Sequence, residues 1–202
     1  MKAFRPAGYL ALGLTVKSGW ASVVLLAGPP QAPRLVDARH IALSDPRIPG
    51  SRQPYHAGFG TARGAGRELR RLVRSAERFG TRSVSGLIRE YKADGHRIRG
   101  AGIVVGSLID PETIGNSHIR IHALEGRLFR EVVLGALRRS RIRSAIWRER
   151  DLASLAVKTL KRRHASLRMT LTAIGQGVQG GWRAEEKAAA LAAWLILARR
   201  QT

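Results

Sequence analysis

The first forty-three residues contain three short apolar runs separated by turn-forming residues. Residues 9–16 and 20–27 are apolar and include β-branched side chains, and a KSG segment separates them. This is the pattern of a β-hairpin with a tight turn. A third run, residues 34–43, follows a GPP segment. The pattern predicts three consecutive antiparallel strands.

A region without hydrophobic periodicity follows, and then a helical pattern begins. Residues 44–66 are rich in Gly and Pro and predict one long loop, a kind of segment that is often functional. From Arg67 onward apolar residues recur at helical spacing, and Gly95 is placed to end this helix. The opposite face of the same helix carries a series of arginines.

The second half of the chain alternates between strand-like and helix-like segments. A compact apolar run around residues 103–105 predicts a buried strand, residues 117–139 a second helix, and SAIWRE a short fifth strand. The segment DLASLAVKTLKRRHASLRM predicts one helix with Asp151 as its N-cap. After the glycine-rich break TAIGQGVQGG, the run EEKAAALAAWLILA predicts an apolar final helix. We expect a single α/β domain over residues 1–202.

Charge changes the picture more than overall composition does. Thirty-six Lys and Arg against fourteen Asp and Glu give a formal charge of +22, which attracts polyanions and favours a nucleic-acid partner. A GC-rich codon bias toward Arg is the alternative explanation. The basic residues form three clusters: Arg63, Arg67, Arg70, Arg71, Arg74 and Arg78; Arg138, Arg139, Arg141 and Arg143; Lys158, Lys161, Arg162, Arg163 and Arg168.

The distribution of these clusters indicates which nucleic acids to expect. Several separate clusters suit a duplex, branched DNA or structured RNA better than a disordered basic arm would, and Arg favours bidentate contacts with phosphate. Aromatic residues make up only 5% of the chain, which disfavours an extended platform for stacking single strands. DNA is favoured over RNA.

Two further features concern the compartment. Cysteine is absent, which excludes disulfides, thiolate metal sites and a cysteine nucleophile. The basic, apolar N-terminus is interrupted by Thr15, Lys17 and Ser18, which argues against a signal peptide, and no apolar run is long enough for a membrane span. We expect a cytoplasmic protein without a membrane partner.

The order of elements, together with three segments, resembles the ribonuclease H-like fold, and within it the RuvC-type Holliday-junction resolvases. The segments are LGLTVKSGWASVVL, IVVGSLIDPETIGNSHIRIHALEGRLFREVV and EEKAAALAAWLILA. The resemblance implies a mixed five-stranded sheet with helices on both faces. It also implies hydrolysis of a phosphodiester by two divalent ions, Mg²⁺ or Mn²⁺, held by carboxylates.

The family's acidic positions are mostly not acidic in this chain. The strand-one acid falls on Thr15, the strand-four acid on Gly106 or Ser107, and the two acids of the last helix on Glu186 and Ala189. Glu186 alone carries a carboxylate. Asp110 and Glu112, just after the fourth strand, could approach Glu186 and supply a differently placed metal site. The alternative roles are a cap before Pro111 for Asp110 and a favourable first-turn charge for Glu186.

Histidines offer a second kind of chemistry. His118 and His122 are four residues apart on a predicted helix, a spacing that can bind Zn²⁺, but a third ligand is not evident and a surface pair near phosphate is an equal alternative. His56 lies in SRQPYHAG beside Arg52, Gln53 and Tyr55. These residue types contact phosphates and bases, although an ordinary surface loop explains them equally well.

The sequence therefore predicts a nucleic-acid-binding protein of the RuvC-like class with a degenerate metal site. The expected nucleic-acid contacts are Lys17, Arg52, His56, Arg63, Arg67, Arg70, Arg71, Arg74, Arg138, Arg139, Lys161, Arg162 and Arg163, and the candidate metal or catalytic acids are Asp110 and Glu186. Three alternatives remain: an active metal-dependent endonuclease, a basic structural subunit of a nucleoprotein assembly, and a phosphate-binding hairpin like that of actin-like ATPases. A homodimer is possible, with the apolar last helix and Trp194 either at its interface or packed on the sheet.

Overall fold

The computed structural model describes residues 9–58, 60–179 and 181–199; the basic N-terminal residues 1–8 lie outside this range. Five strands form one mixed sheet in the order β3-β2-β1-β6-β7. The strands are β1 (Leu10–Lys17), β2 (Trp20–Ala27), β3 (Arg34–Ala42), β6 (Ile98–Val105) and β7 (Ser144–Arg148). The first three are antiparallel, whereas β6 and β7 run parallel to β1. The predicted mixed five-stranded sheet is confirmed.

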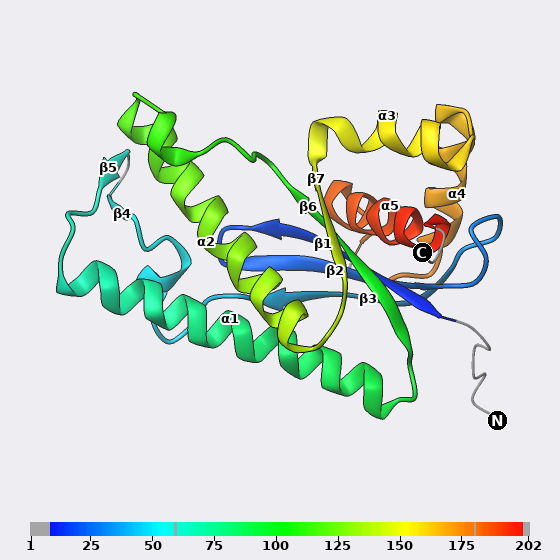
Figure 1. The fold of residues 1–202 in the computed structure, drawn as a ribbon, viewed down its shortest axis with the longest axis horizontal. Helices are drawn as coiled ribbons and strands as arrows, with labels where there is room; N and C mark the ends of the chain where they lie inside the picture. The colour runs from blue at the N-terminus through cyan, green and yellow to red at the C-terminus, as the bar shows by residue number, and fades with distance from the viewer. Residues whose placement is uncertain (1–8, 59, 180, 200–202) are drawn as a thin grey trace.

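Helices cover both faces of this sheet (Figure 1). One face is covered by α1 (Arg67–Ala93) and α2 (Ser117–Arg139), and the other by α3 (Glu149–Leu160), α4 (His164–Ile174) and α5 (Ala184–Ala198). Strand β1 alternates between the two cores: Leu12 and Leu14 face α1 and α2, whereas Ala11 faces α5. Gly13 and Thr15 lie two and four positions after Ala11, so they also face the α5 side.

A pair of glycines allows α5 to pack directly on the sheet. Gly13 and Gly102 are neighbours on β1 and β6. A Cβ atom at Gly13 would clash with the carbonyl of Ala189, and one at Gly102 would lie 2.7 Å from the carbonyl oxygen of Ala192. The alanine-rich sequence of α5 supplies the matching small side chains. This close approach fixes the start of α5 beside the carboxyl end of β1.

The segment between β3 and α1 contains more structure than a loop. A 3-10 turn, η1 (Pro49–Arg52), precedes a small hairpin made of β4 (His56–Gly58) and β5 (Thr61–Ala62). Figure 1 shows this hairpin beside the first turns of α2. A second 3-10 turn, η2 (Pro111–Thr113), precedes α2.

Two details of the C-terminal half differ from the sequence prediction. Helix α3 begins at Glu149, so Asp151 lies in its first turn rather than at the N-cap, and its side chain pairs with Arg148. The predicted single helix is two helices, because Lys161 adopts a left-handed backbone (φ 51°) and ends α3. The break turns α4 back beside the end of α5.

Trp194 is completely buried in the core between α5 and the sheet, and its indole Nε1 donates a hydrogen bond to the carbonyl of Pro30 at 2.6 Å. Of the two roles considered for this helix, packing on the sheet is the one observed. Among the described helices, none combines the length and apolarity that crossing a membrane requires.

Candidate functional site

Thr15, at which the resemblance places the strand-one acid, lies in a row of polar residues that crosses three strands. Thr15 on β1 pairs with Ser22 on β2, which pairs with His40 on β3. Thr15 is buried, and its hydroxyl donates a hydrogen bond of 2.9 Å to the carbonyl oxygen of Glu185 at the start of α5. The hydroxyl therefore anchors a helix to the sheet.

Glu186 contacts the same row of polar residues, and its carboxylate makes hydrogen bonds with neighbouring groups. Oε1 accepts a hydrogen bond from the Ser22 hydroxyl at 3.3 Å and lies 2.5 Å from His40 Nε2. Oε2 accepts from the backbone N–H of Arg183 at 2.7 Å, which makes Glu186 part of a capping box. Burial opposes ionisation, but the hydrogen bonds with His40 and with the backbone N–H groups of Arg183 and Glu186 outweigh it, and the pKa of Glu186 is lowered.

The second family position in the last helix has a packing role. Ala189 is completely buried, and its backbone carbonyl faces Gly13 across the closest point between α5 and the sheet. A carboxylate there would be buried in the apolar core without a described partner.

A lysine ammonium lies between two acids at the carboxyl end of β1. Lys17 Nζ is 3.2 Å from Glu149 Oε2 and 4.0 Å from Glu185 Oε1. The acids come from the starts of α3 and α5, so the Lys17 ammonium, though partly exposed, already pairs with acids of its own chain.

Asp110 has local partners near α2. Its carboxylate accepts a hydrogen bond from the backbone of Glu112 as the cap of η2 and pairs with Arg127 at 3.4 Å. Its neighbour Ser107 accepts a hydrogen bond from the backbone of Ile109. None of these contacts is shared with Glu186. Within the described residues, neither acid belongs to a group of three or more possible metal ligands.

The basic residues divide into engaged and free groups. Arg63 donates to the carbonyls of Pro54 and His56 and pairs with Glu68, so it holds the β4–β5 hairpin in place. Arg162 donates to the carbonyl of Gln31, and Arg139 donates to Thr81. By contrast, the guanidinium groups of five exposed residues on α1 have no hydrogen-bond or ion-pair partner among the described residues: Arg67, Arg70, Arg71, Arg74 and Arg78.

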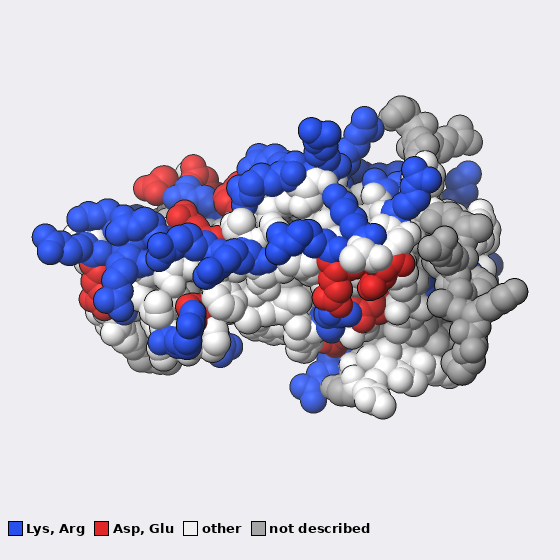
Figure 2. All heavy atoms as spheres, turned by 90° about the horizontal axis from the view of Figure 1, so that it is seen from below, with Lys and Arg blue, Asp and Glu red and all other residues white. Residues whose placement is uncertain are grey.

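Those five arginines lie on one face of α1. Their spacing places them within a narrow arc of the helix surface, opposite the buried residues Leu72, Ala76 and Leu87. Seen from the α1 side, Lys and Arg form a band along most of the molecule (Figure 2). We call these five residues the α1 arginine face.

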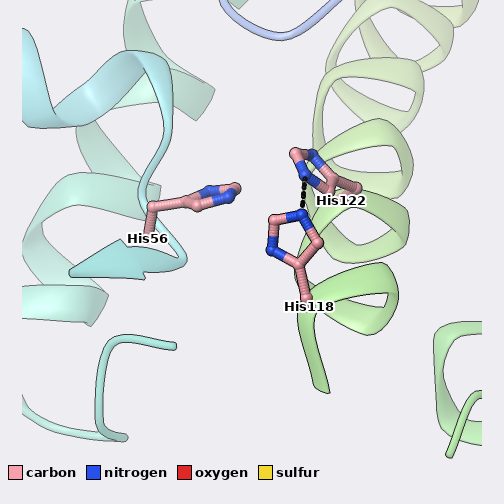
Figure 3. Close-up of side chains that lie close together, drawn as sticks. All are labelled: His56, His118 and His122. Carbon is pink, nitrogen blue, oxygen red and sulfur yellow. Dashed lines mark hydrogen bonds between the residues drawn. The ribbon is translucent and has the colours of Figure 1, made fainter. Parts of the chain in front are cut away.

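Three histidines from two distant segments converge beside the β4–β5 hairpin. His118 and His122 lie on the first turns of α2, with their Nε2 atoms 3.3 Å apart, and His56 at the start of β4 faces both rings (Figure 3). Each can offer one ring nitrogen, and the three nitrogens lie within 4.8 Å of one another. They line one pocket together with Gln53, Arg63 and residues of the hairpin.

A buried glutamate contacts one histidine of this cluster. Glu125 of α2 is completely buried, and its Oε1 lies 2.7 Å from His56 Nδ1. Burial raises the pKa of Glu125, although the hydrogen bond with His56 opposes the rise. Burial, together with the charges of the other two rings, lowers the pKa of His122.

The sequence indicated the parts of this cluster separately but not the combination. The spacing of His118 and His122 predicted one helix face, whereas His56 was expected to contact phosphate with Arg52 and Tyr55. Tyr55 instead packs against the core, and His56 turns toward Glu125. The HxxxHxxE pattern of α2 was the available signal, because it places Glu125 one turn from His122.

The chain is similar to known proteins in its structure but not in its sequence. No protein-family model matches the chain, and no curated protein matches it significantly. Its fold is similar to that of Thermus thermophilus RuvC, both bound to a Holliday-junction substrate (TM-score 0.57, 8% identity, 93% of this chain and 91% of that one) and in a second structure (0.56, 8%, 92% of each chain). The yeast mitochondrial Holliday junction resolvase Ydc2 gives a TM-score of 0.45 at 9% identity, over 98% of this chain and 80% of that one.

The chain therefore has the ribonuclease H-like fold of RuvC-type resolvases, as its element order predicted. The divalent ions of that family require several carboxylate oxygens. The residues at the positions that the resemblance assigned to acids do not fit such ions. Thr15 anchors α5, and Ala189 packs on Gly13. The Glu186 carboxylate is occupied by contacts with Ser22, His40 and the Arg183 backbone.

Proposed function

We propose that this protein binds nucleic acid, with duplex or branched DNA favoured over RNA, and that the α1 arginine face makes the principal contact. The observation that carries the proposal is the set of five exposed guanidinium groups on one helix face, for which residues 9–58, 60–179 and 181–199 supply no hydrogen-bond or ion-pair partner. Of the other two basic clusters, one includes an ion pair between Arg138 and Glu131. The exposed residues of the other, such as Lys158, Arg163 and Arg168, lie on α3, α4 and the turn between them and not along one helix. An unpaired arginine face attracts phosphate oxygens strongly.

The α1 arginine face is long enough to contact several phosphates of a double helix. It extends from Arg67 to Arg78, which is about 17 Å at 1.5 Å per residue. Two strands of DNA place a phosphate about every 1.7 Å along the axis, so the arginines can reach several phosphates at once. Contacts of this kind position the nucleic acid without reading its sequence.

The test is a titration of labelled duplex and four-way-junction DNA at several salt concentrations. We compare the wild type with Arg67→Gln/Arg71→Gln/Arg74→Gln and with a control that removes the same charge from the other layer, Lys158→Gln/Arg163→Gln/Arg168→Gln. The α1 variant should lose at least tenfold in affinity, and its log–log salt slope should fall by about 2 to 3. The control should lose much less.

Two outcomes would contradict the proposal. Equal losses in both variants would mean that net charge rather than the α1 arginine face drives binding. Weak, salt-insensitive binding by the wild type would instead support a structural subunit that needs an assembly partner. The same DNA is incubated with Mg²⁺ or Mn²⁺, and cleavage abolished by Glu186→Gln would support the active endonuclease in place of a binding protein.

A further inference from the structure

We propose that His56, His118 and His122 bind one divalent transition-metal ion of the Zn²⁺ type, at a site separate from the family's carboxylate positions. The three imidazoles supply three nitrogen ligands, and borderline-soft ions such as Zn²⁺ prefer this donor set to the oxygen sets of Mg²⁺. This inference stands independently of nucleic-acid binding.

The distances between ring nitrogens fit such an ion. Two nitrogens held about 2.0–2.1 Å from a tetrahedral zinc lie about 3.3 Å apart, and the Nε2 atoms of His118 and His122 are 3.3 Å apart. The i,i+4 spacing on α2 fixes this pair. A ligand nitrogen of His56 completes a triangle with edges no longer than 4.8 Å. Metal binding would draw this nitrogen closer to the other two.

Glu125 gives His56 the orientation that a ligand needs. Its carboxylate holds Nδ1 of His56 at 2.7 Å, so Nε2 is the ring nitrogen left for the metal. Carboxylates commonly hold metal-ligating histidines in this way from behind, fixing the tautomer and raising the basicity of the ring. Glu125 is completely buried, and a cation on the far side of His56 compensates its charge. We assign Glu125 as a positioning residue.

The site also connects two segments of the fold. His56 belongs to the β4–β5 hairpin, whereas the other two ligands belong to α2. Binding would therefore fasten the hairpin to the helix. The three imidazoles leave a fourth position open toward the pocket that they line, where a water molecule or another ligand can bind.

The experiment is a titration of the untagged, chelator-treated full chain with Co²⁺ and with Zn²⁺. We expect one equivalent of Co²⁺ to give the intense visible absorption of a four-coordinate site, and Zn²⁺ to displace it. His118→Ala and His122→Ala, which alter the outer surface of α2, should each weaken Co²⁺ binding at least 100-fold. His164→Ala, at an exposed position on α4, is the matched control and should bind like the wild type.

Glu125→Gln tests the positioning role separately. It keeps the size of the side chain but weakens the support of His56, so metal affinity should fall about 10- to 100-fold while stoichiometry and spectrum persist. Circular dichroism and thermal melts of the metal-free variants confirm that each one is folded. The proposal fails if the wild type takes up no stoichiometric Co²⁺, or if folded His118→Ala and His122→Ala bind it as His164→Ala does.

Discussion

The hydroxyl of Thr15 donates a hydrogen bond to the carbonyl oxygen of Glu185, and this bond joins the centre of the sheet to the first turn of α5. The resemblance to RuvC-type resolvases implied an acid at this position. Here a hydroxyl donor binds an acceptor that a carboxylate could only repel. In this chain the position forms a structural joint between strand and helix.

Replacing Thr15 by Asp should therefore destabilise the protein instead of restoring a metal site. The buried carboxylate would face the carbonyl oxygen of Glu185 and lose its hydration, at a cost of about 2 to 4 kcal/mol in the free energy of unfolding. Thr15→Val, which only removes the hydroxyl, should cost about 1 to 2 kcal/mol. Urea denaturation of both variants measures the difference. An aspartate variant as stable as the wild type, or stabilised by Mg²⁺, would show that the position still accommodates an acid with its cation.

The close packing of α5 gives a second prediction. Gly13→Ala should destabilise the fold by about 1 to 3 kcal/mol or more, because its new methyl group would meet the backbone carbonyl of Ala189 and α5 would have to move away. Gly126→Ala is the matched control, since a Cβ there meets open space on α2. It should stabilise the helix by about 0.5 to 1 kcal/mol. Chemical denaturation of the two variants should give shifts of opposite sign, and equal shifts would contradict the packing role.

Local patterns in the sequence predicted most of the elements, while the sites depended on contacts between distant segments. Helix α2 has the predicted bounds, and the first hairpin lies where apolar runs flank the KSG turn. The division between α3 and α4 was missed because it depends on Lys161 in a left-handed backbone, which residues other than glycine seldom adopt.

The histidine cluster could be predicted only in part from the sequence, for a different reason. His118 and His122 share a helix, so their proximity follows from spacing alone. The position of His56 depends on the path of the segment between β3 and α1, where Arg63 fastens the backbone of the hairpin. No periodic pattern encodes that path. Likewise, the apolar run of α5 predicted a buried helix but not which of its residues meets Gly13.

A hydrogen bond between β3 and α1 gives a third prediction. The Tyr91 hydroxyl, on a side chain that is almost fully buried, donates to Asp37 Oδ2 at 2.5 Å. Burial raises the pKa of Tyr91 well above its ordinary value, and the hydrogen bond to Asp37 raises it further, so the hydroxyl stays protonated. Tyr91→Phe should cost about 1 to 3 kcal/mol of unfolding free energy, because a bond to a charged acceptor is lost.

Thermal unfolding monitored by circular dichroism checks this effect. Tyr9→Phe serves as the control, because the Tyr9 side chain is about half exposed and its hydroxyl has no hydrogen-bond partner among the described residues. That variant should melt with the wild type. If the Tyr91→Phe melt also coincides with that of the wild type, the ion pair with Arg39 is sufficient for the Asp37 carboxylate.

Glu186 predicts how stability depends on acidity. Its pKa in the folded protein lies below the ordinary value of 4.5, so its ionised form stabilises the fold above that pH, and the contribution is lost as the pH falls through the folded-state pKa. Glu186→Gln should cost about 1.5 to 3 kcal/mol at pH 7, because it removes the charged partner of His40, which also accepts from Ser22 and from the Arg183 backbone. Urea denaturation from pH 7 to pH 3 should show the wild type and the variant converging at the acidic end.

Glu77→Gln, at an exposed position, is the control and should leave the pH profile unchanged. A constant gap between Glu186→Gln and the wild type across this range would mean that the carboxylate acts through its shape and not through its charge.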